Sequence, residues 1–340
     1  MKIGLTYDLK EDVSAHRGQL VQAAPDDILE EYDSLETLQG LCSAIESRGH
    51  SVVRLGGGRP FLERVVHRDV DLVFNISEGL GNYRSREAQV PAVLEMLDIP
   101  YSGADPQCLA VCLDKPLTKK IVSLAGIPTP EWRVVDSQAS LSEMDWEKFP
   151  FPAFVKPAYE GSSKGVRLRS RVETPDQLFD VVASVLSGYR QPVMVERFVA
   201  GEEITVGLVG NSPPVLVGIM RVVPKQKTAN FVYSLEVKRD WENLVEYECP
   251  ARLPETVLQQ ITDHSLLAFD VLGCRDFGRV DFRVGTDGRA YFLEINPLAG
   301  LNPKSSDLPI MARKMGWTYE ALIEAVLDAA LERYPGCSKK

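Results

Sequence analysis

Residues 278–296 read GRVDFRVGTDGRAYFLEIN and predict a β-hairpin. Two runs of alternating side chains flank Asp287 and Gly288, and an Asp-Gly pair between such runs is a strong signal for a two-residue turn. This turn would pair Asp281 with Glu294 and Arg279 with Asn296 across the hairpin. The four side chains would then share one face, because side chains alternate along a strand.

The opposed carboxylates of this hairpin suggest a bound cation. Asp281 and Glu294 would repel each other and destabilise the hairpin unless a positive charge lies between them. Mg²⁺ takes carboxylate and amide oxygens as ligands, and Asn296 adds an amide on the same face. Arg279 suits a phosphate group that lies on such a metal. We therefore expect a magnesium site, and a solvated charged face is the alternative.

A second informative stretch is FVKPAYEGSSKGVRL, residues 154–168. An apolar strand delivers Lys156, and a Gly/Ser loop follows whose N–H groups and hydroxyls can cover a phosphate chain. The GxxxxGK[ST] sequence of a Walker loop is absent. Residues 161–165 match the GxSxG pattern of serine hydrolases, but no helix follows, and the one downstream histidine, His264, lies on an ordinary amphipathic helix. A purely structural loop is the remaining alternative.

The fold class is α/β, because the first 125 residues alternate strands and helices as parallel sheets do. Strands are predicted at 2–7, 51–55 and 71–76, with helices at 34–48, 86–97 and 114–125. From about residue 150 the pattern changes to strands joined by short turns, with helices near 175–187, 254–272 and 318–332.

The composition limits the partners. A chain of 340 residues has room for about two domains. Its net charge of -10 argues against nucleic acid, the first residues do not form a signal peptide, and the lack of an apolar run of about 18 residues argues against a membrane. The scattered cysteines fit reduced thiols in the cytoplasm. The six cysteines lack a CxxC pair and the four histidines lack a ligand pattern, so any metal would be a hard cation on carboxylates.

The order of these elements resembles the ATP-grasp superfamily, and within it the D-alanine–D-alanine ligase branch, over about residues 70–325. The matching runs are LEMLDIPYSG at 94–103, DK at 114–115, KP at 156–157, EGSSKG at 160–165, ERFV at 196–199 and YECPA at 247–251. The resemblance implies three subdomains with ATP between two antiparallel sheets. These are an N-terminal parallel α/β substrate domain (1–112), a central subdomain with the phosphate loop (113–190) and a C-terminal subdomain with the metal and catalytic site (191–335).

The resemblance also implies the site residues. ATP would contact Lys115, Lys156, Glu196, Arg197, Val199, Glu203 and Lys238. Two Mg²⁺ ions, replaceable by Mn²⁺, would bind Asp281, Glu294 and Asn296. Arg279, Ser162 and the backbone N–H at Gly300 would act in catalysis, and Ser306, Asp307 and Arg239 would contact substrate. The implied reaction joins amino acids or a small peptide through an acylphosphate, with the loops around Ser162 and 231–239 excluding water; the resemblance also allows a homodimer.

Departures from the family pattern concern the first substrate. The Gly-Gly-x-Ser-x-Glu run of those ligases is absent at 6–12, and NISEG at 75–79 replaces their Leu-His-Gly motif. The acidic stretch 26–31 is either a solvated helix start or a contact for an ammonium group. Arg239 stands where an aromatic residue is usual and predicts a substrate with an extra anionic or polar group. The alternatives are a genuine D-alanine–D-alanine ligase and a catalytically idle ATP-binding module, although the latter has no need of Arg279.

Overall fold

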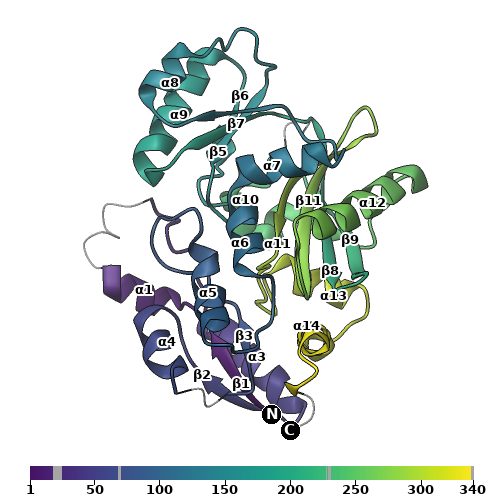
Figure 1. The fold of residues 1–340 in the computed structure, drawn as a ribbon. Coiled ribbons are helices and arrows are strands. Elements are labelled where there is room, and N and C mark those ends of the chain that lie inside the picture. Colours follow the sequence, from purple (N-terminus) through teal and green to yellow (C-terminus); the bar gives the residue numbers. More distant parts are fainter. Residues whose placement is uncertain (18–24, 68–69, 227, 229–230, 338–340) are drawn as a thin grey trace.

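The structure is a computed structural model that describes residues 1–17, 25–67, 70–226, 228 and 231–337. The described chain forms three sheets, each with its own helices, and Figure 1 shows the N-terminal part below, the central part above and the C-terminal part to one side. The expected fold class, with one parallel sheet and two antiparallel sheets, is confirmed.

The N-terminal sheet is parallel, with strand order β2-β1-β3. Its strands are β1 (Lys2–Thr6), β2 (Ser51–Arg54) and β3 (Leu72–Asn75). The helices of this part are α1 (Lys10–Arg17), α3 (Leu35–Ser47), α4 (Gly58–Val65) and α5 (Gln89–Met96), with a 3₁₀ turn η1 (Arg86–Ala88) before α5. The three predicted strands and the helices at 34–48 and 86–97 are confirmed, whereas α1 and α4 were not predicted.

The central sheet is antiparallel, with strand order β4-β7-β5-β6. Its elements are β4 (Trp132–Val135), α8 (Gln138–Glu143), β5 (Ala153–Pro157), η2 (Leu168–Ser170), β6 (Arg171–Val172), α9 (Pro175–Tyr189) and β7 (Val193–Arg197). Helix α9 begins where Thr174 accepts a hydrogen bond from the Gln177 N–H and Pro175 fills the first turn. Because β7 lies inside this sheet, the sheet extends past the expected domain boundary at 190.

The C-terminal sheet is antiparallel, with strand order β10-β9-β8-β11-β12. The strands are β8 (Gly201–Val209), β9 (Val215–Pro224), β10 (Val245–Glu248), β11 (Phe277–Gly285) and β12 (Ala290–Asn296). The helices are α6 (Pro106–Leu113), α7 (Lys115–Leu124), α10 (Leu235–Arg239), α11 (Trp241–Leu244), α12 (Glu255–Val271), α13 (Asp307–Lys314) and α14 (Tyr319–Arg333). Side chains of α6, α7 and α12 share one apolar core with this sheet, and α13 and α14 share another with it and with the N-terminal sheet.

The β11–β12 hairpin has the predicted register where the polar residues lie. Asp281 faces Glu294 and Arg279 faces Asn296. Nearer the turn the pairing shifts by one residue, so that Leu293 is the extra residue of a β-bulge. The predicted two-residue turn is wrong, since the N–H of Gly285 donates to the carbonyl of Arg289 and the turn encloses residues 286–288. The longer turn and the bulge offset each other.

The first strand, β1, and the last helix, α14, both lie in the lower part of the molecule (Figure 1). Helix α14 packs against α3, and its Arg333 forms a 2.6 Å ion pair with the buried Asp276. Arg333 also donates to the carbonyl of Tyr101, so this side chain ties the last helix to both the N-terminal and C-terminal parts. Within the described ranges, no helix has the length and apolar character needed to cross a membrane.

Candidate functional site

Two cavities meet at the polar face of the β11–β12 hairpin. The first, here called the sheet cavity, has a volume of about 90 Å³ and lies between the two antiparallel sheets. The second, here called the domain cavity, has a volume of about 440 Å³. It is lined by the N-terminal part, the glycine-rich loop at 161–162, the segment 233–239 and the segment after β12. Lys115, Arg279 and Glu294 line both cavities, so a group bound in one can reach a group bound in the other.

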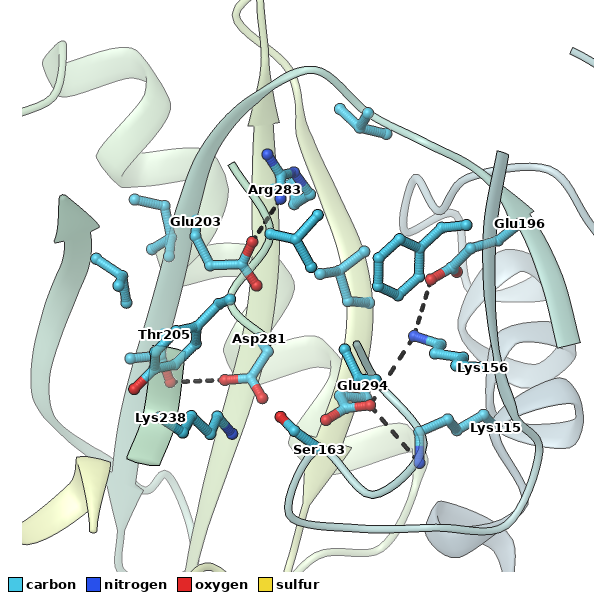
Figure 2. A pocket seen from close by; sticks show the side chains of 18 of the residues that line it. Lys115, Lys156, Ser163, Glu196, Glu203, Thr205, Lys238, Asp281, Arg283 and Glu294 are labelled. Carbon is cyan, nitrogen blue, oxygen red and sulfur yellow. Dashed lines mark hydrogen bonds and ion pairs between the residues drawn. The ribbon is translucent and has the colours of Figure 1, made fainter. Parts of the chain in front are cut away.

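Lysines from two elements converge on one wall of the sheet cavity (Figure 2). Lys156 at the end of β5 lies 2.8 Å from the carboxylate of Glu196 and 4.0 Å from that of Glu294. Lys115 lies 3.6 Å from Glu294, and the fully buried Lys119 lies 2.8 Å from Glu196. Burial lowers the pKa of Lys119 to about 8, although Glu196 opposes that change. A cationic wall of this kind suits a phosphate chain.

The polar face of the hairpin carries the predicted metal ligands. Arg279 lies 2.8 Å from the carboxylate of Asp281, which also accepts hydrogen bonds from Thr205 at 2.6 Å and from the amide of Asn296 at 3.3 Å. Burial by itself would raise the pKa of Glu294, but the neighbouring Lys115 and other cations lower it to about 2. The repulsion that suggested a metal is thus already balanced by cations of the chain, and this part of the reasoning is wrong.

The oxygen donors themselves still fit a hard cation. Asp281, Glu294 and Asn296 present carboxylate and amide oxygens from one face of one hairpin, and each of them lines one or both cavities. Such donors are the ones that Mg²⁺ prefers. The fit therefore rests on the chemistry of these donors.

The far end of the sheet cavity is closed by a second ion pair. Arg283 on β11 lies 2.7 Å from Glu203 on β8, and Figure 2 shows both side chains above Asp281. Arg283 follows Asp281 by two residues, so the alternation of the strand would have indicated it. Lys238 stacks over the ring of Tyr233 at 5.0 Å, at the border of both cavities.

The segment after β12 lines the domain cavity. The Ser306 hydroxyl accepts a hydrogen bond from the N–H of Asn302 and lies beside Gly300, where a Cβ atom would come within 2.8 Å of it. Asp307 lies 3.4 Å from Arg279 and accepts a hydrogen bond from Tyr233 at 3.2 Å. Arg279 is thus held between two carboxylates at the junction of the cavities.

A buried ion cluster fixes the glycine-rich loop against the N-terminal part. Lys164 lies 2.8 Å from Glu31 and 2.6 Å from Glu160, and Arg86 lies 2.5 Å from Glu31 and 3.1 Å from Glu160. All four side chains are at least 96% buried. In addition, buried Asp27 accepts hydrogen bonds from Gly165 and Tyr189. The prediction of a solvated helix start at 26–31 is therefore wrong, because this stretch holds the loop.

Arg239 is engaged by the same acidic stretch. Its guanidinium lies 2.5 Å from Glu30 and 2.9 Å from Asp26, and it also lines the domain cavity. The expected contact with a substrate carboxylate is thus in competition with two carboxylates of the chain. It stays a prediction.

Three thiols that are far apart in the sequence meet in the core. The Sγ atom of Cys108 lies 3.8 Å from that of Cys112 and 3.6 Å from that of Cys274. Within the described residues the cysteines form no disulfide. Cys108 and Cys112 are one helical turn apart on α6 and so have the CxxxC spacing, not the CxxC spacing.

Each site residue expected from the sequence lines at least one of the two cavities. The sheet cavity holds Lys115, Lys156, Glu196, Arg197, Val199, Glu203, Lys238, Arg279, Asp281 and Glu294. The domain cavity holds Ser162, Arg239, Asn296, Gly300, Ser306 and Asp307. Sequence reasoning missed Lys119, which follows Lys115 by one helical turn, and the ion cluster of Glu31, Arg86 and Lys164, for which no local signal exists.

Comparisons with known proteins point to one family. The family described as D-ala D-ala ligase C-terminus matches residues 121–328. A D-alanine–D-alanine ligase of Aquifex aeolicus is 34% identical over 295 residues, which covers 86% of this chain and 94% of that protein. One of Desulforudis audaxviator is 34% identical over 303 residues, covering 88% and 94%. The crystal structure of D-alanine–D-alanine ligase from Bacillus anthracis complexed with ATP superposes with a TM-score of 0.73 at 22% identity, covering 99% of both chains.

Proposed function

The chain belongs to the D-alanine–D-alanine ligase family, and we propose that it is an ATP-dependent ligase that joins the carboxylate of one small molecule to the amine of another. The observation that carries the proposal is the junction of a lysine-lined cavity with a larger polar cavity at Arg279 and Glu294. A nucleotide in the first and a carboxylate in the second would meet at these two residues. The proposed substrates are amino acids or a small peptide.

The sheet cavity would hold ATP. Lys115, Lys156 and Lys238 would contact phosphates as point charges, the backbone at 196–199 would meet the adenine edge, and Glu203 would meet the ribose. The cavity of about 90 Å³ is smaller than the roughly 300 Å³ and more that ligand pockets offer. We infer that the two antiparallel sheets separate to admit the nucleotide and that the described state is a closed one.

Magnesium would bind at the hairpin through Asp281, Glu294 and Asn296, whose oxygens suit a hard cation. When bound, Mg²⁺ neutralises charge on the phosphate oxygens and orients them. Lys115 and Lys156 contact Glu294 in the described state, and we infer that they turn towards phosphates when nucleotide and metal are present. The carboxylate of Glu294, no longer paired with these lysines, is then available as a metal ligand.

The proposed reaction has two steps. A carboxylate oxygen of the first substrate attacks the γ-phosphorus of ATP, the bond to the β-phosphate oxygen breaks, and ADP leaves. The amine of the second substrate attacks the resulting acylphosphate carbon, phosphate leaves, and the amine loses a proton. Arg279 and the N–H at Gly300 would stabilise the oxyanion of the second step. The loop with Ser162 and the segment 231–239 would exclude water from the acylphosphate.

The second candidate function is a genuine D-alanine–D-alanine ligase, which the names of the relatives favour. The lining of the domain cavity favours a charged substrate over alanine, because Asp33, Glu78 and Glu87 are among its side chains and a methyl group gains nothing from a carboxylate. A homodimer and a place in the cytoplasm remain predictions from the sequence.

The test is ADP formation from Mg-ATP across L- and D-amino acids, offered singly and in pairs. We expect ADP only with one or a few pairs, together with a condensed product in a mass spectrum. Arg279→Lys, which keeps the charge but loses the bidentate geometry, should lower kcat by at least about a hundredfold. ATP binding without ADP formation for any pair would contradict the proposal and favour an idle nucleotide-binding module.

A further inference from the structure

Three carboxylates on one wall of the domain cavity have no partner among the described residues. Asp33, Glu78 and Glu87 line this cavity, and the side-chain oxygens of none of them form a hydrogen bond or an ion pair there. Glu87 is only 8% exposed. A buried, ionised carboxylate without a partner is costly, and Glu87 shares the cavity with the half-buried Asp33 and Glu78. This acidic wall, defined as Asp33, Glu78 and Glu87, therefore calls for a cation that the described residues do not supply.

The acidic wall is not short of neighbouring cations. Arg86 is adjacent to Glu87 in the chain, yet its guanidinium lies on Glu31 at 2.5 Å and on Glu160 at 3.1 Å. The other cations that line the domain cavity are likewise placed against other groups: Lys10 at 3.8 Å from Glu30, Arg239 on Glu30 and Asp26, Arg279 on Asp281 and Asp307, Lys115 on Glu294 and Lys238 over Tyr233. The cations that line the domain cavity are thus placed against other groups, and these three carboxylates stay open to the cavity.

The pKa values of the three carboxylates agree with the lack of a counter-ion. Burial raises the pKa of Glu78 well above its ordinary value, and the nearby charge of Glu87 raises it further. Burial also raises the pKa of Glu87 to about 7, although Arg86 lowers it. Burial and the charge of Asp8 raise the pKa of Asp33 in the same way. A bound cation would favour the ionised forms of all three.

The spacing of the three carboxylates argues against a metal ion as that cation. Among the described residues, the only group of three or more His, Cys, Asp or Glu ligands whose donor atoms all lie within 4.8 Å of one another is the buried thiol group of Cys108, Cys112 and Cys274. The three carboxylates of the acidic wall therefore do not meet around one ion. A longer organic molecule with two positive groups can reach them.

We propose that the acidic wall binds a diamino carboxylate, so that one substrate of this ligase carries a cationic group in addition to its α-ammonium group. A neutral amino acid offers one cation to three carboxylates, whereas a basic amino acid offers two that are several bonds apart. The carboxylate of the substrate would point to Arg279 and Gly300, which line the same cavity. This inference rests on the proposed function, since it names the substrate class of the same site.

The test compares lysine, ornithine and 2,4-diaminobutyrate with norleucine, which matches the lysine chain in length but lacks its terminal amine. ADP formation is measured for the L- and D-forms, each with a panel of second amino acids. We expect at least one diamino acid to have a KM about tenfold or more below that of norleucine. Glu78→Gln and Glu87→Gln should raise this KM by about tenfold to a hundredfold, the effect of a lost hydrogen bond to a charged group.

Two controls separate recognition from a structural effect. Norleucine should keep its KM within about threefold in Glu78→Gln, because it lacks the group that the carboxylate recognises. Glu46→Gln changes an exposed carboxylate on α3, outside both cavities, and should leave all constants unchanged. A preference for norleucine over every diamino acid, or equal losses for both classes in Glu78→Gln, would overturn the inference while ADP formation still supports a ligase.

A ligand-binding measurement decides the inference even if no pair yields ADP, the result that would overturn the proposed function. Calorimetry with a non-hydrolysable ATP analogue and Mg²⁺ then compares the same amino acids. Tighter binding of a diamino acid than of norleucine, lost in Glu78→Gln, would uphold the acidic wall as a dication site. Equal binding of the two would overturn it.

Discussion

Replacing Glu294 by Gln tests the electrostatics of the hairpin and the proposed metal site together. The substitution keeps the size of the side chain and removes its charge. In the described state Lys115 at 3.6 Å and Lys156 at 4.0 Å would lose their carboxylate neighbour. We therefore expect the apo protein to become less stable, although two opposed carboxylates considered alone would predict a gain.

The magnitude follows from the pKa of Glu294, which lies at about 2 instead of 4.5. A depression of this size corresponds to about 3 kcal/mol of folding free energy at neutral pH. Solvent reaches 22% of the side chain, so screening reduces the expected loss to about 1–3 kcal/mol. Because the folded pKa is depressed, this stability is present above pH 4.5 and is lost as the pH falls towards 2.

Urea unfolding of wild type and Glu294→Gln between pH 4 and pH 8 measures this difference. The difference in the free energy of unfolding between the two proteins should be constant above about pH 5 and should become smaller below it. Glu246→Gln, an exposed glutamate on β10 of the same sheet, is the matched control and should show no such difference. The Glu294→Gln variant should also lose at least about a hundredfold in kcat/KM at saturating Mg²⁺, because it lacks a proposed metal ligand. A stability equal to the wild type would refute the electrostatic reasoning, and a wild-type rate would refute the metal assignment.

Three further predictions concern the loops and sheets. Arg86→Met should lower the free energy of unfolding by about 3–5 kcal/mol, since it leaves buried carboxylates uncompensated. The control Arg59→Met, at an exposed position, should change it by less than about 0.5 kcal/mol. Equal urea midpoints for the two variants would contradict a stabilising role of the ion cluster. Gly201→Ala should cost more than about 2 kcal/mol by the same assay, because Gly201 has φ +148° and a Cβ atom would lie 1.9 Å from the carbonyl oxygen of Val284. Arg239→Tyr should cost less than about 1 kcal/mol, as expected for an exposed ion pair, and a rise in KM above tenfold would indicate that the guanidinium meets the substrate after all.

The strands and longer helices could be predicted because their signals are local. The hairpin 278–296 contains both partners of each pair within one short stretch, and α9 has its cap residue and its first-turn proline in sequence. The short helices α4 and α13, eight residues each, offer only about two turns of periodicity and were missed. Helix α6 was also missed. Asp105 and Pro106 indicate where it begins, but its mostly apolar residues do not alternate with polar ones at the helical period.

The site could be predicted where family motifs cover it and not where distant segments meet. The ion cluster joins Glu31, Arg86 and Lys164, which belong to three separate segments, and no residue next to any of them indicates its partner. The hairpin register was right near Asp281 although the turn was wrong, because the bulge at Leu293 restored the pairing. Such compensation depends on how the strands pack and cannot be read from turn chemistry alone.

The two joined cavities differ in the charge of the groups that they offer to a ligand, and under the proposed function this difference would assign a part of the reaction to each. The sheet cavity brings Lys115, Lys156 and Lys238 to one end, where an anionic phosphate chain would replace the carboxylate of Glu294. The domain cavity keeps the carboxylates of the acidic wall, where a cationic substrate would replace protons. Under the proposed function, ligands of opposite charge would be drawn to different cavities, and their reacting groups, a phosphate and a carboxylate, would meet at Arg279, which lines both. A first substrate without a second cationic group would not be oriented by the acidic wall, so its carboxylate would reach Arg279 less often. We therefore expect a lower kcat as well as a higher KM for such a substrate.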